Sequence, residues 1–297
     1  MFEGIEGNNR NKNLLSKIIE NKNVSHSYIF AGTKGIGKLL FAKEFSKALF
    51  CENDKNKPCD ICPSCKKFSN NNHPDFYILD AGEESIKNEQ IREITQKILE
   101  KPTNGDRKIY IINNAENMTI QAQNSLLKTL EEPPEYATII LIVGNENLLL
   151  NTIKSRCIKF EFNNLDDNDI IKILKEKYQY DIDLKFIKSI NGSMERALKI
   201  KENEEIYYKI EKAFTNLQNI DIIDLLKQKD EIFEDKDSTY DILDYVTNTF
   251  YLNKQLNCLQ LVEEAKDRLK KNCNYDMTID NFLFAIWEEI NGKHNRS

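Results

Sequence analysis

Short apolar runs alternate with segments of helical periodicity over the first half of the chain. The runs are SYIFAG (27–32), DFYILD (75–80), KIYIIN (108–113), ATIILIVG (137–144) and CIKFEF (157–162). Runs of this length, bounded by polar or glycine residues, are typical of buried strands. Helical spacing of apolar residues follows three of them, over 39–49, 86–99 and 119–132. Because strands alternate with helices, we expect an α/β domain with a parallel five-stranded sheet and crossover helices.

The second half of the chain has a different pattern. Beyond about Phe162 the strand signals stop, and three short helical segments follow at 166–178, 183–190 and 193–202. From about Asn203 onward the pattern stays helical, with longer segments at 240–252 and 281–290. We therefore expect three units: an α/β core over 1–163, a small helical unit over 164–202 and an all-helical domain over 203–297.

A glycine-rich stretch lies between the first expected strand and its helix. FAGTKGIGKLLFAKEF (30–45) fits the phosphate-loop pattern G-x-x-x-x-G-K-[ST] through Gly32, Gly37 and Lys38, but Leu39 occupies the hydroxyl position. In a working loop, backbone N–H groups cradle the phosphates, the lysine reaches their oxygens and the hydroxyl holds Mg²⁺. The candidate nucleotide-binding residues here are Gly32, Thr33, Lys34, Gly35, Gly37, Lys38 and Leu39.

A second change falls where the acidic partner of such a loop is expected. In KIYIINNAE (108–116), Asn113 and Asn114 follow the strand in place of an acidic pair, and Glu116 is expected to lie off the strand end. An amide cannot supply negative charge to magnesium or act as a general base for water. Two losses at one metal predict that ATP is not hydrolysed here, and leave open whether a nucleotide still binds.

Four of the seven cysteines fall within one short loop. Cys51, Cys59, Cys62 and Cys65 have the spacing C-x7-C-x2-C-x2-C, and four thiolates in one loop suit a tetrahedral structural zinc. An iron–sulfur cluster also takes four thiolates and is the competing interpretation. His73 is close in sequence, and we expect a lone surface histidine there.

Composition and charge narrow the classes of protein. The 297 residues are 40% hydrophobic and 30% charged, an ordinary globular balance. A net charge of −6 argues against non-specific nucleic-acid binding by the chain alone. The N-terminal stretch MFEGIEGNNRNKNLL has no apolar core of signal-peptide length, and no run approaches the roughly 18 apolar residues of a membrane helix. We therefore expect a cytoplasmic protein without a membrane contact.

Several motifs together carry a family resemblance. The phosphate loop, the cysteine quartet, NNAENMTIQAQNSLLKTLEEPPEYATIILIV (113–143) and TIKSRCIKFEF (152–162) resemble the bacterial clamp-loader AAA+ subunits of DNA polymerase III. The degenerate loop most resembles the delta-prime type. The resemblance covers roughly residues 1–200, and beyond them only the helical pattern matches. It implies an AAA+ core over 1–163, a helical lid over 164–202 and an oligomerising helical collar over 203–297.

The resemblance also implies roles for single residues. The SRC motif makes Arg156 an arginine finger that reaches the ATP site of a neighbouring subunit, and a structural ion pair at a strand start is the alternative. GSMERAL (192–198) makes Arg196 a lid residue that senses bound nucleotide. Asn145 could fill a sensor position, but a turn asparagine fits its place equally well. Lys128 is expected on a solvated helix face or a DNA-facing surface.

The implied function is that of a non-hydrolysing delta-prime subunit. Such a subunit is a scaffold that helps load the sliding clamp during DNA replication, within the DNA polymerase III holoenzyme of the nucleoid-associated replisome. Its partners would be gamma/tau and delta subunits, with the sliding clamp and primer–template DNA contacted through the complex. The alternative is an active ATPase of the gamma/tau type, against which Leu39 and Asn113 argue. A small P-loop kinase, or a zinc module that binds nucleic acid alone, would leave most of these motifs unexplained.

Overall fold

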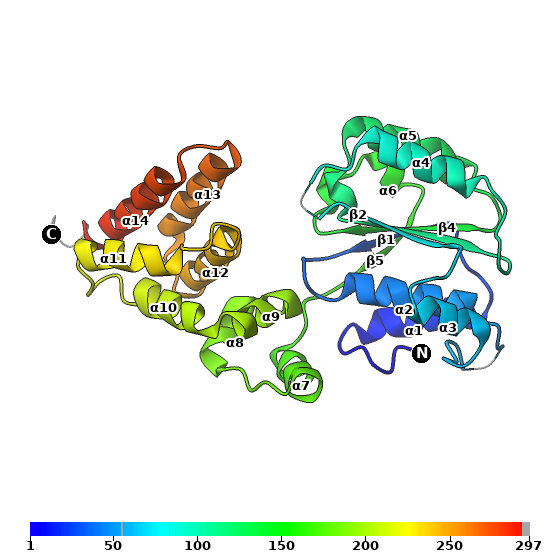
Figure 1. Ribbon diagram of the computed structural model, residues 1–297, viewed down its shortest axis with the longest axis horizontal. Helices are drawn as coiled ribbons and strands as arrows, with labels where there is room; N and C mark the ends of the chain where they lie inside the picture. The colour runs from blue at the N-terminus through cyan, green and yellow to red at the C-terminus, as the bar shows by residue number, and fades with distance from the viewer. Residues whose placement is uncertain (55, 83, 293–297) are drawn as a thin grey trace. The chain divides into compact units, whose positions relative to one another are not determined.

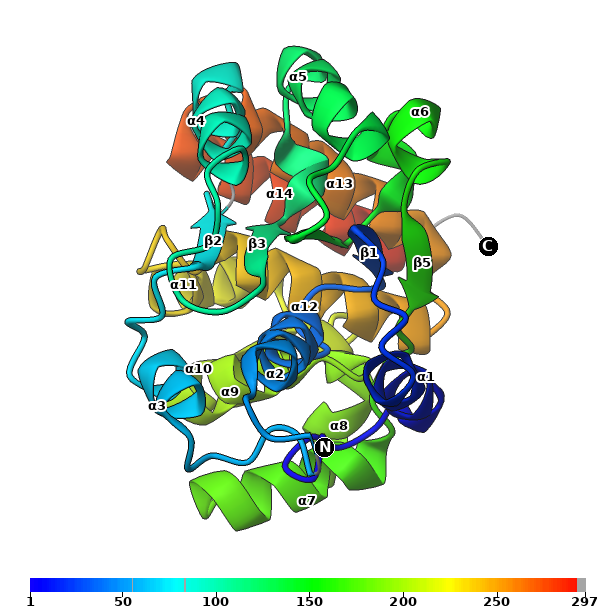
Figure 2. The same ribbon diagram turned by 90° about the vertical axis from the view of Figure 1, so that its right-hand side faces the viewer.

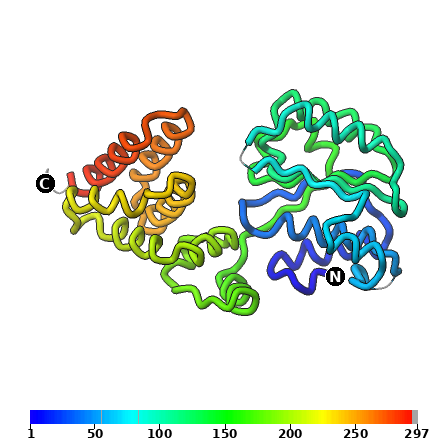
Figure 3. The backbone as a smooth tube through the Cα atoms, in the orientation of Figure 1, coloured from blue at the N-terminus to red at the C-terminus, as the bar shows by residue number. Residues whose placement is uncertain are grey.

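The computed structural model describes residues 1–54, 56–82 and 84–292. The chain divides into two compact units, the first comprising Met1–Asp169 and the second beginning at Ile170. The first unit holds all the strands of the described residues, and the second consists of helices and loops (Figure 3).

The first unit is built on one parallel sheet. Its strands lie side by side in the order β2-β3-β4-β1-β5. Figure 2 shows β2 and β5 at the edges. The strands are β1 (Ser27–Ala31), β2 (Phe76–Asp80), β3 (Lys108–Asn113), β4 (Ala137–Val143) and β5 (Ile158–Glu161). The five strands predicted from the sequence are thus confirmed, as is the parallel α/β fold.

Helices cover both faces of the sheet, because each parallel connection must cross over it. Figure 1 shows α1, α2 and α3 on one face and α4, α5 and α6 on the other. Their bounds are α1 (Asn9–Glu20), α2 (Lys38–Phe50), α3 (Pro63–Ser69), α4 (Asn88–Ile98), α5 (Ile120–Glu131) and α6 (Asn151–Lys154), and two short 3₁₀ turns, η1 (Ala115–Asn117) and η2 (Glu146–Leu148), follow β3 and β4.

Strand alternation divides the core of this unit into two layers. On β3, Ile109 and Ile111 face the cluster under α1 and α2, while Tyr110 and Ile112 face the cluster under α4 and α5. Since all four side chains are essentially inaccessible to water, the sheet is rigidly held. The loops at its ends are therefore positioned by a packed scaffold.

The second unit is helical. It contains α7 (Asp167–Tyr178), whose first turn belongs to the first unit, and α8 (Leu184–Ile190), α9 (Met194–Glu202), α10 (Glu204–Thr215), α11 (Ile222–Ile232), α12 (Thr239–Leu252), α13 (Leu256–Lys270) and α14 (Tyr275–Asn291). Asn203 alone separates α9 from α10. The predicted boundaries at residues 163 and 202 remain predictions.

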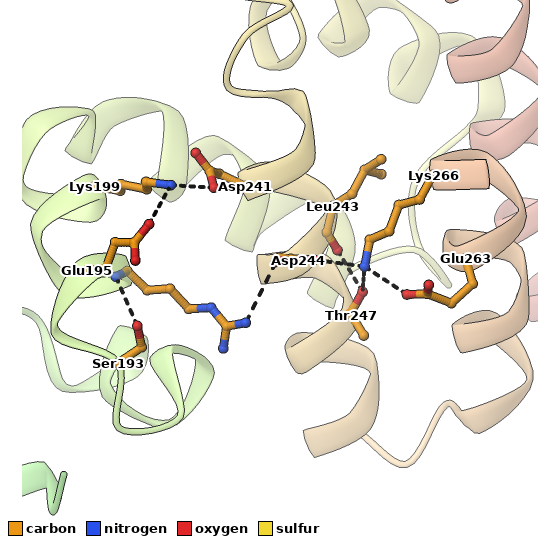
Figure 4. A network of polar contacts seen from close by, with 10 residues as sticks. Ser193, Glu195, Lys199, Asp241, Leu243, Asp244, Thr247, Glu263 and Lys266 are labelled. Atoms are coloured by element: carbon orange, nitrogen blue, oxygen red, sulfur yellow. Dashed lines mark hydrogen bonds and ion pairs between the residues drawn. The ribbon is translucent and has the colours of Figure 1, made fainter. Parts of the chain in front are cut away.

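A network of ion pairs links three helices of this unit (Figure 4). Lys199 on α9 contacts Asp241 on α12 at 2.5 Å, and Lys266 on α13 contacts Asp244 on α12 at 2.8 Å. Arg196, the predicted nucleotide sensor, lies on α9 with its Nη2 atom 3.7 Å from Asp244. Residues of the predicted lid and collar thus share one polar network.

Within the described part of the chain, no helix combines the length and apolar composition that crossing a bilayer requires.

Candidate functional site

The phosphate loop connects the carboxyl end of β1 to the first turn of α2. Gly32 has φ +155°, and a Cβ atom there would lie 2.4 Å from the backbone oxygen of Phe162. Gly35 and Gly37 adopt φ values of 82° and 89°, which glycine reaches at no steric cost. The loop conformation therefore depends on its glycines, and it leads into the N-terminus of α2, whose backbone N–H groups suit an anion.

Lys38 is buried and turned onto its own loop. Its Nζ atom donates to the backbone oxygens of Gly32 at 2.6 Å and Thr33 at 2.5 Å. Leu39, at the position of the missing hydroxyl, packs against the core cluster under α1 and α2. The loop thus keeps its cation, while an apolar contact replaces the magnesium ligand.

At the end of β3 the two asparagines bind a carboxylate instead of supplying one. The amide nitrogen of Asn113 donates to Asp80 at 2.8 Å, and that of Asn114 donates to the oxygen of Gly82 at 3.1 Å. Asp80 comes from the end of β2, and its other carboxylate oxygen accepts from the backbone of Gly82 at 3.1 Å. The amide groups at the acidic positions are used to fix a neighbouring loop.

The next polar groups along this edge also have structural partners. Glu116 lies in η1, and its Oε1 atom accepts from the backbone of Gly144 at 2.7 Å. The Oε2 atom is buried without a hydrogen-bond partner among the described residues. Asn145 accepts from the backbone of Asn147 at 3.0 Å and caps η2, which is the turn role. Lys128 is exposed on α5, which fits both a solvated face and a DNA-facing surface.

The four predicted cysteines come together at the end of α2. Their sulfur atoms all lie within 4.8 Å of one another, with Cys51, Cys62 and Cys65 buried and Cys59 partly exposed. Zinc with bonds of about 2.3 Å places tetrahedral sulfurs about 3.8 Å apart. Backbone N–H groups of Cys62 and Cys65 donate to the sulfurs of Cys59 and Cys62, each at 3.4 Å. The donor set and its spacing fit one four-coordinate metal ion.

Without a cation, the protein environment does not ionise all four thiols. Burial raises the pKa of the Cys51 and Cys65 thiols. Burial acts in the same direction on Cys59, but hydrogen bonds from the backbone of Cys62 and Ile61 lower its pKa to about 6. Because a coordinated thiol loses its proton outright, a bound metal would supply the charge that stabilises the buried thiolates.

His73 is not a surface residue, so that expectation was wrong. It is 5% exposed, and its ring stacks on Phe50 with the centroids 3.9 Å apart. Its Nε2 atom lies 3.0 Å from the hydroxyl of Ser64, and burial lowers its pKa. His73 thus connects the cysteine loop to the aromatic core without belonging to the sulfur cluster. Sequence proximity suggested its neighbourhood but not its burial.

Arg156 is fixed at the amino end of β5. Its backbone oxygen accepts from Ser27, the first residue of β1, at 2.7 Å. Its Nη2 atom contacts Glu131 at 2.6 Å and its Nη1 atom donates to the oxygen of Thr152 at 2.7 Å. The side chain is 32% exposed. The alternative named for Arg156, an ion pair at a strand start, is thus present in the structure, with Glu131 from the end of α5 as a partner that the sequence did not identify.

The structure therefore separates the candidate nucleotide residues from Arg156. The phosphate loop follows Ala31 at the carboxyl end of β1, whereas Arg156 contacts Ser27 at its amino end. The two ends of β1, Ser27 and Ala31, are four residue steps apart, or about 13 Å at about 3.3 Å per residue. A guanidinium cannot cross that distance through a packed sheet, so Arg156 cannot serve the loop of its own chain. Arg196 belongs to the second unit.

Comparison with known proteins yields relatives for the first unit. The family model for the delta subunit of DNA polymerase III matches residues 7–166, more than half of the chain. Subunit delta-prime of DNA polymerase III from Bacillus subtilis is 34% identical over 65% of this chain and 58% of the relative. Subunit tau from the same bacterium is 36% identical over 57% of this chain and 30% of the relative.

A solved structure supports the fold over a longer range. A DNA polymerase III gamma subunit-related protein from Thermotoga maritima has a TM-score of 0.53, with 93% of this chain and 98% of that one covered. At 20% identity this likeness shows the fold alone. The matches span less than two thirds of the length of the delta-prime and tau relatives. From the family model and these relatives, the chain belongs to the family of bacterial DNA polymerase III clamp-loader AAA+ subunits.

Proposed function

We propose that the chain is a delta-prime-type clamp-loader subunit. It does not hydrolyse ATP at its own loop, and it supplies Arg156 to the ATP site of a neighbouring subunit. The placement of the loop and Arg156 at opposite ends of β1 carries this proposal. The partners would be gamma/tau and delta subunits, and the sliding clamp and primer–template DNA would be met through the assembly.

The absence of hydrolysis follows from the groups around the loop. Leu39 offers no oxygen to Mg²⁺, and Asn113 and Asn114 offer amides that already hold Asp80 and Gly82. Phosphoryl transfer depends on a metal that bridges the phosphate oxygens and on a group that orients the attacking water. The loop amides and Lys38 can bind a nucleotide, but they do not supply the groups that hydrolysis needs.

The action of Arg156 in trans follows from its chemistry and its place. A guanidinium is permanently charged and binds phosphate oxygens through two parallel N–H donors. Arg156 is partly exposed at a sheet end remote from its own loop, so a nucleotide whose phosphate it contacts would be bound by another subunit. The family resemblance also makes Arg196 a lid residue that senses bound nucleotide. In the structure its side chain contacts Asp244 on α12.

Zinc is proposed as the metal of the cysteine cluster. The set is closed by four sulfur ligands, and zinc prefers this tetrahedral geometry. Held between the end of α2 and the start of α3, it would be structural, because all four positions are taken by protein.

The second candidate is an active ATPase of the gamma/tau type. The comparison leaves it open, since a tau relative is 36% identical over 57% of this chain and the delta-prime relative 34% identical over 65%. The two candidates differ in whether this chain turns over ATP.

Equilibrium ATP binding and steady-state hydrolysis on the isolated chain, with and without partner subunits, distinguish the candidates. The delta-prime proposal predicts no turnover by the isolated chain, whether or not ATP binds. Substantial turnover that disappears in Lys38→Ala would instead establish the gamma/tau type.

A further inference from the structure

We propose that Glu131 is an internal counter-ion that holds Arg156 until a phosphate of a neighbouring subunit displaces it. This inference rests on the proposed function, in which Arg156 acts in trans. It adds a regulatory contact within the chain. Before Arg156 stabilises charge on a neighbouring subunit, its own charge is neutralised by Glu131 of the same chain.

The contacts of the guanidinium carry the inference. Nη2 lies 2.6 Å from Oε1 of Glu131, and Nη1 lies 2.7 Å from the backbone oxygen of Thr152. Both terminal nitrogens, which form the fork that binds phosphate, are therefore engaged inside the chain. To grip a phosphate with this fork, Arg156 has to exchange or share these partners.

Arg156 is otherwise firmly anchored. Its backbone nitrogen donates to Ile153 at 3.0 Å, and its backbone oxygen accepts from Ser27 at 2.7 Å. Only the side chain is then available for the exchange, so a change of partner needs no rearrangement of the sheet. Such an arrangement suits a residue that alternates between two anions.

The exposure of the pair sets how strong the restraint is. The side chains of Arg156 and Glu131 are 32% and 48% exposed, and exposed ion pairs shift an equilibrium by about two- to five-fold. A nucleotide phosphate carries more charge than one carboxylate, so it displaces Glu131 when a neighbour presents it correctly. The carboxylate also repels an approaching phosphate, which adds to the restraint before assembly is complete.

The chain offers a matched control in the adjacent residue. Glu132 is an exposed glutamate at the C-cap of α5, and Glu132→Gln removes the same charge one position away. Glu131→Gln keeps the shape and the hydrogen-bonding oxygen at 131 but removes the carboxylate charge from Arg156. A difference between the two variants therefore reports on the pairing and not on net charge.

The test measures ATP hydrolysis by the reconstituted clamp loader without DNA or clamp. Glu131→Gln should raise this basal rate two- to five-fold through kcat, with little change in KM for ATP. Glu132→Gln should leave it unchanged. In an Arg156→Ala background, Glu131→Gln should have no effect, because the residue that it restrains is gone.

Three results would overturn the inference. A Glu131→Gln rate equal to that of Glu132→Gln would mean that the pair restrains nothing. A lower rate, or a lowered melting temperature of the chain without a gain in rate, would make Glu131 a structural partner of Arg156. If Arg156→Ala itself leaves hydrolysis unaltered, the proposed function of Arg156 fails and this inference falls with it.

Discussion

Single residues decide which chemistry the AAA+ core of this chain retains. Lys38 and the loop glycines keep the geometry of a phosphate site, whereas Leu39 and Asn113 remove the magnesium ligands. Both residues make stabilising contacts in the fold, since Leu39 packs against the core and Asn113 donates a hydrogen bond to Asp80. The proposed loss of catalysis is thus compatible with a well-packed fold.

Replacement of Cys62 by serine tests the metal at this scale. The purified chain should carry one zinc ion, and Cys62→Ser should lose it because three thiolates and a neutral hydroxyl bind zinc poorly. Metal analysis by mass spectrometry measures the stoichiometry. Cys273→Ser, at an exposed cysteine outside the cluster, is the control. A wild-type chain free of zinc, or one with an iron–sulfur absorption spectrum, would contradict the assignment.

His73 predicts a loss of stability in mild acid. Its pKa is lowered in the folded chain by burial, so below about pH 6.5 the unfolded chain takes up this proton first. The free energy of unfolding should therefore fall as the pH drops below 6.5, until the lowered folded pKa is passed. Denaturant titrations between pH 7.5 and 5 measure this fall.

The part of the slope that belongs to His73 should disappear in His73→Gln. His26→Gln, at a partly exposed histidine, serves as the comparison. An unchanged slope in His73→Gln would show that its protonation is not linked to folding.

At the scale of elements, the sequence predicted the sheet better than its surroundings. The five strands are continuous apolar runs, because both faces of a parallel sheet are covered. Helix α1 was missed since polar residues, three of them Asn or Lys, fill all but one of its exposed positions, and α3 since its seven residues are read as part of the cysteine loop. The signals that failed were those too short or too polar to show a period.

The parts of the site that were missed depend on contacts remote in sequence. Glu131 meets Arg156 across 25 positions, and Lys199 meets Asp241 across 42. Local periodicity fixes which face of a helix is exposed, but not which charge on another element it meets. The cysteine cluster was predictable because all four ligands lie within one loop.

Gly32 tests the close approach between the loop and the end of β5. In Gly32→Ala the new Cβ would lie 2.4 Å from the oxygen of Phe162 and 2.9 Å from Ile36. The overlap should lower the free energy of unfolding by about 1–3 kcal/mol. Gly4→Ala, where nothing lies within 4 Å, should change it by less than about 0.5 kcal/mol. Urea unfolding of both variants makes the comparison, and equal stabilities would contradict this packing.

At the scale of the whole molecule, the sheet of the first unit separates the residues of the two proposed functions. The phosphate loop lies at the carboxyl end of β1, and Arg156 lies at its amino end. A chain with this layout can receive a nucleotide at one edge and act on another subunit's nucleotide from the other. In the proposed function, the lack of magnesium ligands at its own loop leaves the role of Arg156 intact.

Arg156→Ala in the reconstituted clamp loader tests this division of roles most directly. Arginine fingers raise the rate of phosphoryl transfer by about 10³–10⁵ in other systems. ATP hydrolysis at the neighbouring subunit's site should therefore nearly stop, while the other ATP sites of the assembly continue. Arg156→Lys should rescue poorly, because an ammonium lacks the planar fork. The measurement is DNA- and clamp-stimulated ATP hydrolysis, with assembly checked by gel filtration. We predict normal assembly with a reduced rate, and normal assembly with an unreduced rate would show that Arg156 is only structural.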